Sequence, residues 1–75
     1  MITLDLIKKN QKVKVISIFG GKNIRQRLSG LGIHIDDTII VLRNICMQSP
    51  ILINIHGNQV ALGTGIAKKI LVELE

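Results

Sequence analysis

Aromatic side chains are almost absent from this 75-residue sequence, in which Phe19 is the one aromatic residue. Proteins that hold single-stranded nucleic acids usually stack the bases on aromatic side chains, and grooves for proline-rich peptides are lined by the same residue types. The composition therefore argues against both kinds of binding module. The core must instead be packed from isoleucine, leucine and valine, and so many β-branched residues favour strands.

Cysteine is equally scarce, because Cys46 stands alone and no disulfide can form within the chain. Residues 1–5 show no signal-peptide pattern, so the sequence predicts a protein of the reducing cytosol. Apolar runs such as residues 39–42 and 70–72 are far shorter than the roughly 18 residues of a membrane-spanning helix. We expect a soluble chain without membrane insertion, forming one domain over residues 1–75.

Acidic residues are few: five stand against ten lysines and arginines, which gives a formal net charge of +5. Such an excess on a small domain suggests an acidic partner, whether nucleic acid, an anionic lipid surface or an acidic protein face. The basic residues are spread along the chain without a block of five or more. A merely solvated basic surface is the competing interpretation.

Catalytic motifs are lacking as well. The hydroxyl and thiol groups have only His34 and His56 as potential bases, and no recognisable nucleophile motif surrounds any of them. The run Gly20-Gly21-Lys22 lacks the spacing with which a phosphate loop cradles its ligand. We therefore predict that the protein is not an enzyme and has no small-molecule substrate.

Metal-ligand spacings are also missing. His34, Cys46 and His56 carry atoms that transition metals accept, but no CxxC, HxxxH or ExxH pair holds two ligands together. We assign no metal site and no cofactor. These three residues are the candidates for any transition metal ion binding by the chain.

One helical segment organises the sequence, from Gly20 to Ile33. Ile24, Leu28 and Leu31 recur at positions i, i+4 and i+7, which predicts a helix with these three side chains on one buried face.

Both ends of this helix carry capping patterns. Asn23 is predicted as the N-cap, and Gln26 three positions later suits a capping box that closes back on it. At the other end, Gly32 followed by Ile33 predicts termination by a left-handed glycine with an apolar residue just beyond it.

The remainder of the chain is predicted to be β. Residues 12–18 alternate polar and apolar side chains, which predicts a strand with Val13 and Val15 on one face and Ile16 and Ile18 on the other. Short antiparallel strands in so small a protein favour a closed or nearly closed barrel. The other predicted elements are a strand or helical turn at 3–7, a turn at 35–38, strands at 39–43, 51–55, 60–62 and 69–74, a loop at 46–50, a two-residue hairpin loop at Gly57-Asn58, and a helical turn capped by Thr64.

The helical segment resembles a known family. The run from Gly20-Gly21 through Ile24-Arg25-Gln26-Arg27-Leu28 to Leu31-Gly32-Ile33 is similar to the GG-x-x-[LI]-R-x-R-L-x-x-[LM]-G-[LI] core of FeoA proteins. The resemblance extends from Leu4 to Val72, although Lys9-Asn10 and Ile35-Asp36 replace the Pro-Gly pairs that are common in the family. FeoA proteins are small cytoplasmic accessory components of bacterial ferrous iron transport.

This resemblance implies a mainly β fold: a small SH3-like β-barrel of about five strands with one short helix inserted after the first main strand. It also implies a non-enzymatic role in Fe²⁺ transport, in which the chain binds the cytoplasmic part of the FeoB GTPase-permease and is recruited to the inner membrane through it. Fe²⁺ would be the transported ion rather than a cofactor.

Two groups of residues follow from these considerations. We assign partner binding to Lys22, Arg25, Gln26 and Arg27 and fold maintenance to Gly20, Gly21, Ile24, Leu28, Leu31, Gly32 and Gly57. The alternative function is a basic barrel that binds structured RNA or duplex DNA through phosphate contacts.

Overall fold

The structure, a computed structural model, describes residues 1–45 and 49–75. Most of the predicted loop at 46–50, including Cys46, therefore lies outside the described residues. Within the described ranges the elements follow in the order β1 (Ile2–Thr3), the 3₁₀ turn η1 (Leu4–Leu6), β2 (Lys12–Ile18), α1 (Lys22–Gly30), β3 (Thr38–Arg43), β4 (Ile51–Ile55), β5 (Asn58–Leu62), α2 (Thr64–Ala67) and β6 (Ile70–Leu74).

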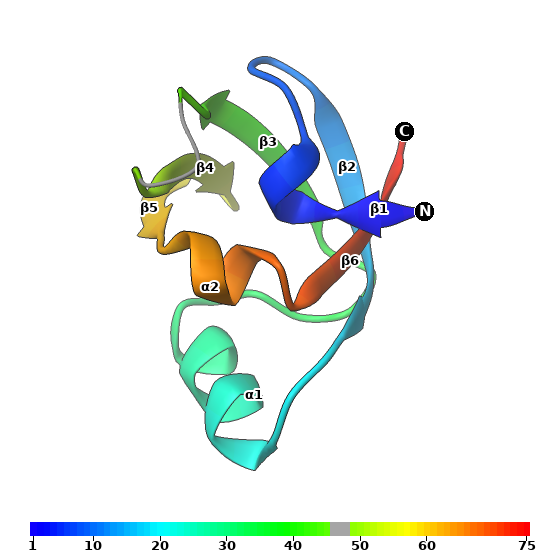
Figure 1. Cartoon of the computed structure of the whole chain (residues 1–75), viewed down its shortest axis with the longest axis vertical. Coiled ribbons are helices and arrows are strands. Elements are labelled where there is room, and N and C mark those ends of the chain that lie inside the picture. The colour runs from blue at the N-terminus through cyan, green and yellow to red at the C-terminus, as the bar shows by residue number, and fades with distance from the viewer. Residues whose placement is uncertain (46–48) are drawn as a thin grey trace.

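Across the described residues, the strands join in one antiparallel sheet of six, in the order β1-β6-β2-β3-β4-β5 (Figure 1). The predicted SH3-like arrangement, with a helix inserted after the first main strand, is confirmed. The sheet does not close, however, because the edge strands β1 and β5 are not neighbours. β1 continues into η1 and β5 into α2, and these two turns contact each other. Helical turns thus meet where a closed barrel would have strand pairing.

The interior of the sheet is aliphatic, and no polar or charged residue is buried among the described residues. Alternation along β4 shows how the core is filled, because every second side chain of a strand points to the same face. Its odd-numbered isoleucines are buried while Leu52 and Asn54 are partly exposed. The buried set is Leu4, Ile7, Val13, Val15, Ile18, Leu28, Ile33, Ile39, Val41, Ile51, Ile53, Ile55, Leu62, Ala67, Ile70 and Val72.

A β-bulge in β2 changes the predicted faces of that strand. Val15 pairs with Val72 of β6, but Leu71 then pairs with Ser17, so Ile16 is an extra residue without a direct partner. An extra residue shifts the alternation by one. Ile18 is consequently buried together with Val15, and the prediction that Ile16 and Ile18 share the opposite face is wrong.

The hairpin between β4 and β5 turns one residue earlier than predicted. Its two loop residues are His56 and Gly57, with φ of 51° and 81°, and β5 begins at Asn58. Positive φ at both loop residues is the type I′ pattern, whose twist matches that of the flanking strands. The left-handed geometry predicted for this turn is present, but His56 adopts it in place of Asn58.

The single-turn helix α2 is also displaced by one residue from its predicted cap. Gly63 is the N-cap and makes no side-chain hydrogen bond, while Thr64 is the first helical residue. The predicted Thr64 cap is therefore wrong. Asn10, in the turn before β2, has a φ of 71°. Asparagine tolerates this left-handed conformation better than most residues.

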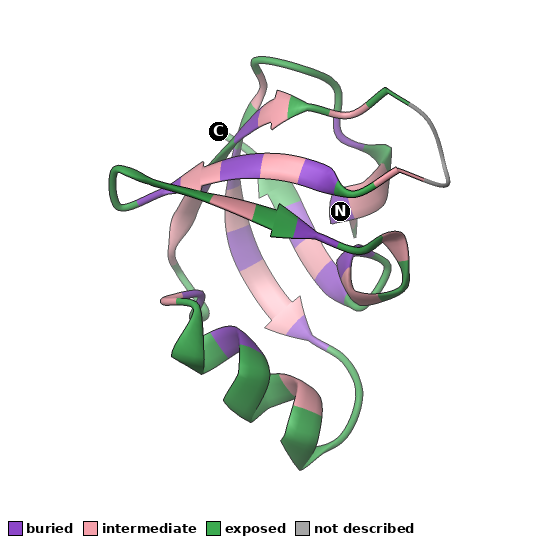
Figure 2. Ribbon diagram, turned by 90° about the vertical axis from the view of Figure 1, so that its left-hand side faces the viewer, coloured by how far each residue is buried: buried purple, intermediate pink, exposed green. Residues whose placement is uncertain are grey.

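Helix α1 lies at one end of the sheet and is mostly exposed (Figures 1 and 2). Of its nine residues, all of them described, Leu28 is the buried one, and Ile24 packs against the core while partly exposed. Leu31 is 39% exposed, so the prediction that it completes a buried stripe is wrong. The helix ends at Gly30 and Leu31 is its C-cap, so the helical spacing no longer applies there.

The chain reverses after α1 through the predicted left-handed glycine. Gly32 has a φ of 85°, and its N–H donates to the carbonyl of Ser29 at 3.0 Å. The N–H of Ile33 donates to the carbonyl of Leu28 at 2.9 Å. This pair of bonds is the Schellman motif, in which the residue after the glycine packs on the last helical turn. Ile33, only 1% exposed, takes the core position predicted for Leu31.

We predict opposite sensitivities for the two leucines of this segment. Leu28→Ala removes a fully buried side chain and should lower the free energy of unfolding by roughly 2–5 kcal/mol. Leu31→Ala, at an exposed position, should change it by less than about 1 kcal/mol. Urea unfolding followed by circular dichroism measures both, and equal effects would contradict the assignment of Ile33 to the third core position.

Candidate functional site: the basic face of helix α1

Helix α1 begins without a side-chain cap. Its N-cap is Gly21, which offers no side-chain acceptor, and Asn23 is the second helical residue. The prediction that Asn23 caps the helix with Gln26 closing a capping box is therefore wrong. The first backbone N–H groups of α1 therefore have no hydrogen bond to a capping side chain. The positive end of the helix dipole lies at these groups.

Gly20 sets the direction in which α1 leaves the sheet. Its φ is 105°, and a Cβ atom at this position would lie 2.8 Å from Cδ1 of Ile24 and 3.4 Å from Cδ of Lys69. The neighbouring N–H of Phe19 donates to the carbonyl of Lys69 at 2.7 Å. The turn is thus held against the residue that precedes β6, and only glycine fits it without strain.

Three of the four predicted partner-binding residues share one surface. Lys22, Arg25 and Gln26 line an open hollow of about 510 Å³ together with Gly20 and Ser29. Their spacing of three or four residues puts the helical members on one face of α1. We call this surface the α1 hollow.

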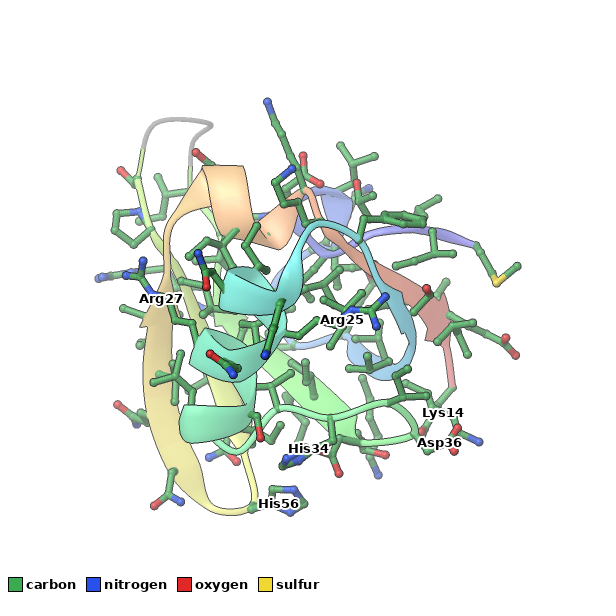
Figure 3. The ribbon with its side chains drawn as sticks, turned by 90° about the horizontal axis from the view of Figure 1, so that it is seen from below. Lys14, Arg25, Arg27, His34, Asp36 and His56 are labelled. Atoms are coloured by element: carbon green, nitrogen blue, oxygen red, sulfur yellow. The ribbon has the colours of Figure 1, made fainter. Side chains whose placement is uncertain are left out.

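Arg27, the fourth predicted residue, is not part of the α1 hollow. Figure 3 shows Arg25 and Arg27 extending to opposite sides of α1, Arg25 toward β2 and Arg27 toward β5. Both side chains are exposed. The structure therefore divides the predicted binding residues between two sides of one helix.

The cations of α1 have no internal counter-charge. Within residues 1–45 and 49–75, Lys22, Arg25 and Arg27 make no ion pair and no side-chain hydrogen bond, and α1 itself contains no acidic residue. The stem of Lys69 approaches Gly20 and brings a further lysine to the beginning of the helix. The three cations of α1 are thus uncompensated by acidic side chains of the described chain.

A second polar cluster lies at the other end of α1, around Asp37. His34 Nδ1 lies 3.4 Å from Asp37 Oδ2, and His56 Nε2 lies 3.2 Å from Asp37 Oδ1. The backbone N–H of His34 also donates to Asp37 Oδ2 at 2.7 Å, and Ser29 Oγ lies 3.1 Å from His34 Nε2. The cluster links α1, the segment before β3, and the β4–β5 hairpin, with both histidines side by side in Figure 3.

These contacts lower the pKa of Asp37. Desolvation of the partly buried carboxyl acts to raise the pKa, but it is outweighed by the hydrogen bond from the His34 backbone and by hydrogen bonding and charge from His56 and the His34 ring. Hydrogen bonds to the ionised form favour that form. Asp37 is therefore a carboxylate at neutral pH.

The structure brings together two of the three metal candidates, His34 and His56, while Cys46 lies outside the described residues. Among the residues that are described, no group of three or more histidine, cysteine, aspartate or glutamate side chains has an arrangement that could hold a metal ion. The two histidines instead share hydrogen bonds to Asp37. We assign no metal site to the cluster.

Sequence reasoning did not identify Asp37 as the residue between the histidines. His56 follows Asp37 by 19 positions, and the two meet only because the β4–β5 hairpin turns at His56. No short-range pattern in the sequence predicts the contact between Asp37 and His56. The approach of Lys69 to Gly20 is long-range in the same way.

The sequence model of the FeoA domain matches residues 2–74. The chain belongs to the FeoA family. Among FeoA relatives, the "Putative Fe(2+) transport protein A" of Methanocaldococcus jannaschii is 37% identical over 73 residues, which cover 97% of this chain and 87% of the relative.

Solved FeoA structures share the fold over nearly the whole chain. A crystal structure of an iron uptake regulatory protein (FeoA) has a TM-score of 0.89 and 32% identity, covering 99% of this chain and 96% of the other. The NMR structure of a FeoA-like protein from Clostridium acetobutylicum has a TM-score of 0.86 and 32% identity, with coverages of 97% and 85%. The family resemblance carried by Gly20 to Ile33 is thereby confirmed. None of the described helices of this FeoA chain has the length and hydropathy to cross a membrane.

Alanine substitutions at Gly20, just before α1, and at Gly30, at the end of α1, should have opposite effects on the free energy of unfolding. Gly20→Ala forces a side chain into positive φ and onto Ile24, so we expect a loss of roughly 1–3 kcal/mol in unfolding free energy. Gly30→Ala meets open space in a helical conformation and should stabilise the FeoA chain by up to about 1 kcal/mol. Urea unfolding curves provide the measurement, and a stabilised Gly20→Ala protein would refute the close-approach argument.

The Asp37 cluster should make stability depend on pH. Because the pKa of Asp37 is lower in the folded than in the unfolded chain, the carboxylate stabilises the fold above the unfolded pKa, near 4. This contribution is lost as the pH falls through the folded-state value. Asp37→Asn should therefore be less stable than wild type at pH 7, by about 1 kcal/mol or less, with the difference shrinking below pH ~4.

Asp36→Asn is the matched control for this titration. Asp36 is exposed and its ion pair with Lys14 is long, at 3.9 Å, and asparagine tolerates its φ of 74°. We expect a smaller difference from wild type in the same unfolding series. A pH-independent effect of Asp37→Asn would show that the charge of Asp37 does not stabilise the fold.

Proposed function

We propose that this chain is a non-enzymatic accessory protein of ferrous iron transport that binds the cytoplasmic part of the FeoB GTPase-permease through α1. In this proposal the chain acts in the cytoplasm and reaches the inner membrane through its partner. Fe²⁺ is the cargo of the transport system, and the proposal requires no resident metal in this chain.

Family membership supports the transport role. The FeoA domain accounts for residues 2–74, and the relative from Methanocaldococcus jannaschii, at 37% identity, carries the name of an Fe(2+) transport protein. The match covers nearly all of both chains. The role proposed for this chain is therefore one that its family already suggests.

The observation that carries the binding surface is the uncompensated charge of α1. Three cations on nine helical residues have no acidic partner within the described chain. Exposed cations attract acidic protein surfaces and speed association with them. A basic helix that projects from the end of a rigid sheet is well placed to meet a second protein (Figure 1).

The non-enzymatic part of the proposal must account for Ser29, His34 and Asp37, which lie in the order of a Ser–His–Asp triad. This arrangement is solvent-exposed at Ser29 and His34. The N–H groups that follow Ser29 are engaged, since those of Leu31 and Gly32 bond to helix carbonyls. They are thus not free to stabilise an oxyanion, which acyl-transfer chemistry needs. These features favour a structural role for the three residues.

We expect Arg25→Glu combined with Arg27→Glu to abolish retention of the chain on the immobilised cytoplasmic part of the permease, because the change reverses two unpaired cations. Co-purification with and without guanine nucleotide and Fe²⁺ provides the measurement. Circular dichroism should show an unchanged fold, since both side chains are exposed.

Lys8→Glu combined with Lys9→Glu is the matched control. It makes the same change in net charge in the exposed segment between η1 and β2, at the opposite end of the molecule from α1 (Figure 1). This variant should bind like wild type. Equal retention of all three proteins would rule out the α1 surface, and failure of the wild type to bind would rule out the proposed partner. Binding of duplex DNA or structured RNA in place of the permease would favour the nucleic-acid alternative.

A further inference from the structure

The α1 hollow differs from the rest of the basic surface in its shape. It is a concave region of about 510 Å³ between the turn at Gly20 and Ser29, with the side chains of Lys22, Arg25 and Gln26 along it. A volume of this size accommodates one or two amino-acid side chains. The hollow thus offers a receptacle lined by two cations of one helix.

The chemistry of the hollow selects for negative charge. Two of its lining residues are cations, the Gln26 amide supplies hydrogen-bond donors, and no acidic side chain among residues 1–45 and 49–75 lines it. Arginine presents a planar fork of donors that matches a carboxylate, and charge-assisted bonds of this kind are roughly twice as strong as neutral ones. The uncapped beginning of α1 and the nearby Lys69 add positive potential at the same end.

An apolar contact lies next to the hollow along the chain. Phe19 directly precedes Gly20 and is 48% exposed, although it is the one aromatic residue of the protein. Its backbone is fixed by the hydrogen bond from its N–H to Lys69. An exposed aromatic residue next in sequence to a residue that lines a cationic hollow suits a ligand that joins an acidic group to an apolar one.

These features favour an acidic protein segment, rather than nucleic acid or an anionic membrane, as the ligand of the α1 hollow. Single-stranded nucleic acid would need several stacking platforms, and the chain offers one aromatic ring. Duplex nucleic acid and anionic membranes present many phosphates, which are bound by extended clusters of cations. A concave site with two lining cations instead fits one or two carboxylates.

We infer that the α1 hollow receives an aspartate or glutamate side chain, followed or preceded by an apolar residue that contacts Phe19, from the cytoplasmic part of the permease. The inference rests on the proposed function and specifies how its binding surface works. Arg25 holds the carboxylate, Lys22 adds charge at the beginning of the helix, and Arg27 stays outside the contact.

The test uses two charge reversals on one helix. Arg25→Glu and Arg27→Glu make the same chemical change at exposed positions two residues apart, on opposite sides of α1 (Figure 3). We expect Arg25→Glu to weaken binding of the purified cytoplasmic part of the permease at least tenfold, because it loses a charge-assisted contact and adds repulsion. Arg27→Glu should weaken binding less than about threefold. Calorimetric titration of the full chain provides both values.

Three further measurements sharpen the result. Arg25→Lys should lie between wild type and Arg25→Glu, because it keeps the charge and loses the planar fork. Phe19→Ser should weaken binding by several-fold without altering its salt dependence. Lysine substitutions at acidic positions of the partner should include one that weakens wild-type binding and restores binding to Arg25→Glu.

The outcomes separate the inference from the function on which it rests. Equal losses for Arg25→Glu and Arg27→Glu, a loss confined to Arg27→Glu, or no loss in either would each overturn the α1 hollow while the permease remained the partner. Absence of wild-type binding to the cytoplasmic part would instead overturn the proposed function. Wild-type binding to duplex DNA or to vesicles of anionic lipid that is lost in Arg25→Glu, with permease binding unchanged, would assign the hollow to a phosphate ligand.

Discussion

The seating of α1 on the sheet depends on the turn at Gly32. Two hydrogen bonds close this turn, and they place Leu28 and Ile33 side by side in the core. A short helix with one buried side chain has little stability of its own, because most helical stability in proteins comes from tertiary packing. The turn therefore does more than end the helix. It supplies the second apolar contact that orients α1, and so determines which of its faces meets solvent.

Once α1 is oriented in this way, the charge distribution of the protein follows from where the acidic residues stand. None of the five acidic residues stands on α1. Four of them contact polar or basic groups elsewhere in the chain. The recorded partners are Thr3 for Asp5, Lys14 for Asp36, the two histidines for Asp37, and Thr38 for Glu75. Lys22, Arg25 and Arg27 are thus left without an ion-pair partner among the described residues. Exposed charges of this kind contribute little to folding, so the basic face is available for binding at small cost to stability.

Much of the fold could be predicted from local patterns in the sequence. The predictions that failed have a common physical cause. Strands at 12–18 and 51–55, the left-handed Asn10 and Gly32, and the single helix all follow from periodicity and turn chemistry. The predictions fail where a shift of a single residue changes which face a side chain takes or where a turn lies. The bulge at Ile16 moved Ile18 to the core face, and the turn at His56 displaced the predicted loop. Such shifts are decided by pairing with distant strands, which local sequence does not encode.

In the candidate site, too, some features could be predicted from local sequence and others depend on long-range contacts. Lys22, Arg25 and Gln26 could be assigned to one helical face from spacing alone, and the structure places them around one hollow. The separation of Arg27 from that hollow also follows from spacing, because two residues turn an α-helix by about 200°. The contacts of Asp37 with His56 and of Lys69 with Gly20 join residues far apart in the sequence. Sequence periodicity therefore identifies the composition of a face, whereas its shape and its neighbours depend on the tertiary fold.

The Asp37 cluster gives the two ends of α1 different mechanical roles. Ser29 contacts His34, and His34 and His56 both contact Asp37, so the last turn of the helix is connected to the β4–β5 hairpin by polar groups at the surface. Each such contact contributes about 1 kcal/mol or less, too little to hold the fold alone. Together they connect the C-terminal end of the helix to the segment before β3 and to the β4–β5 hairpin. Among the described residues, the side chains of Lys22 and Arg25 at the N-terminal end have no comparable polar contacts, and this end is held by the Gly20 turn and the packing of Ile24. The polar contacts of the last turn thus lie beside Arg27 and away from Lys22 and Arg25, the two cations that line the α1 hollow.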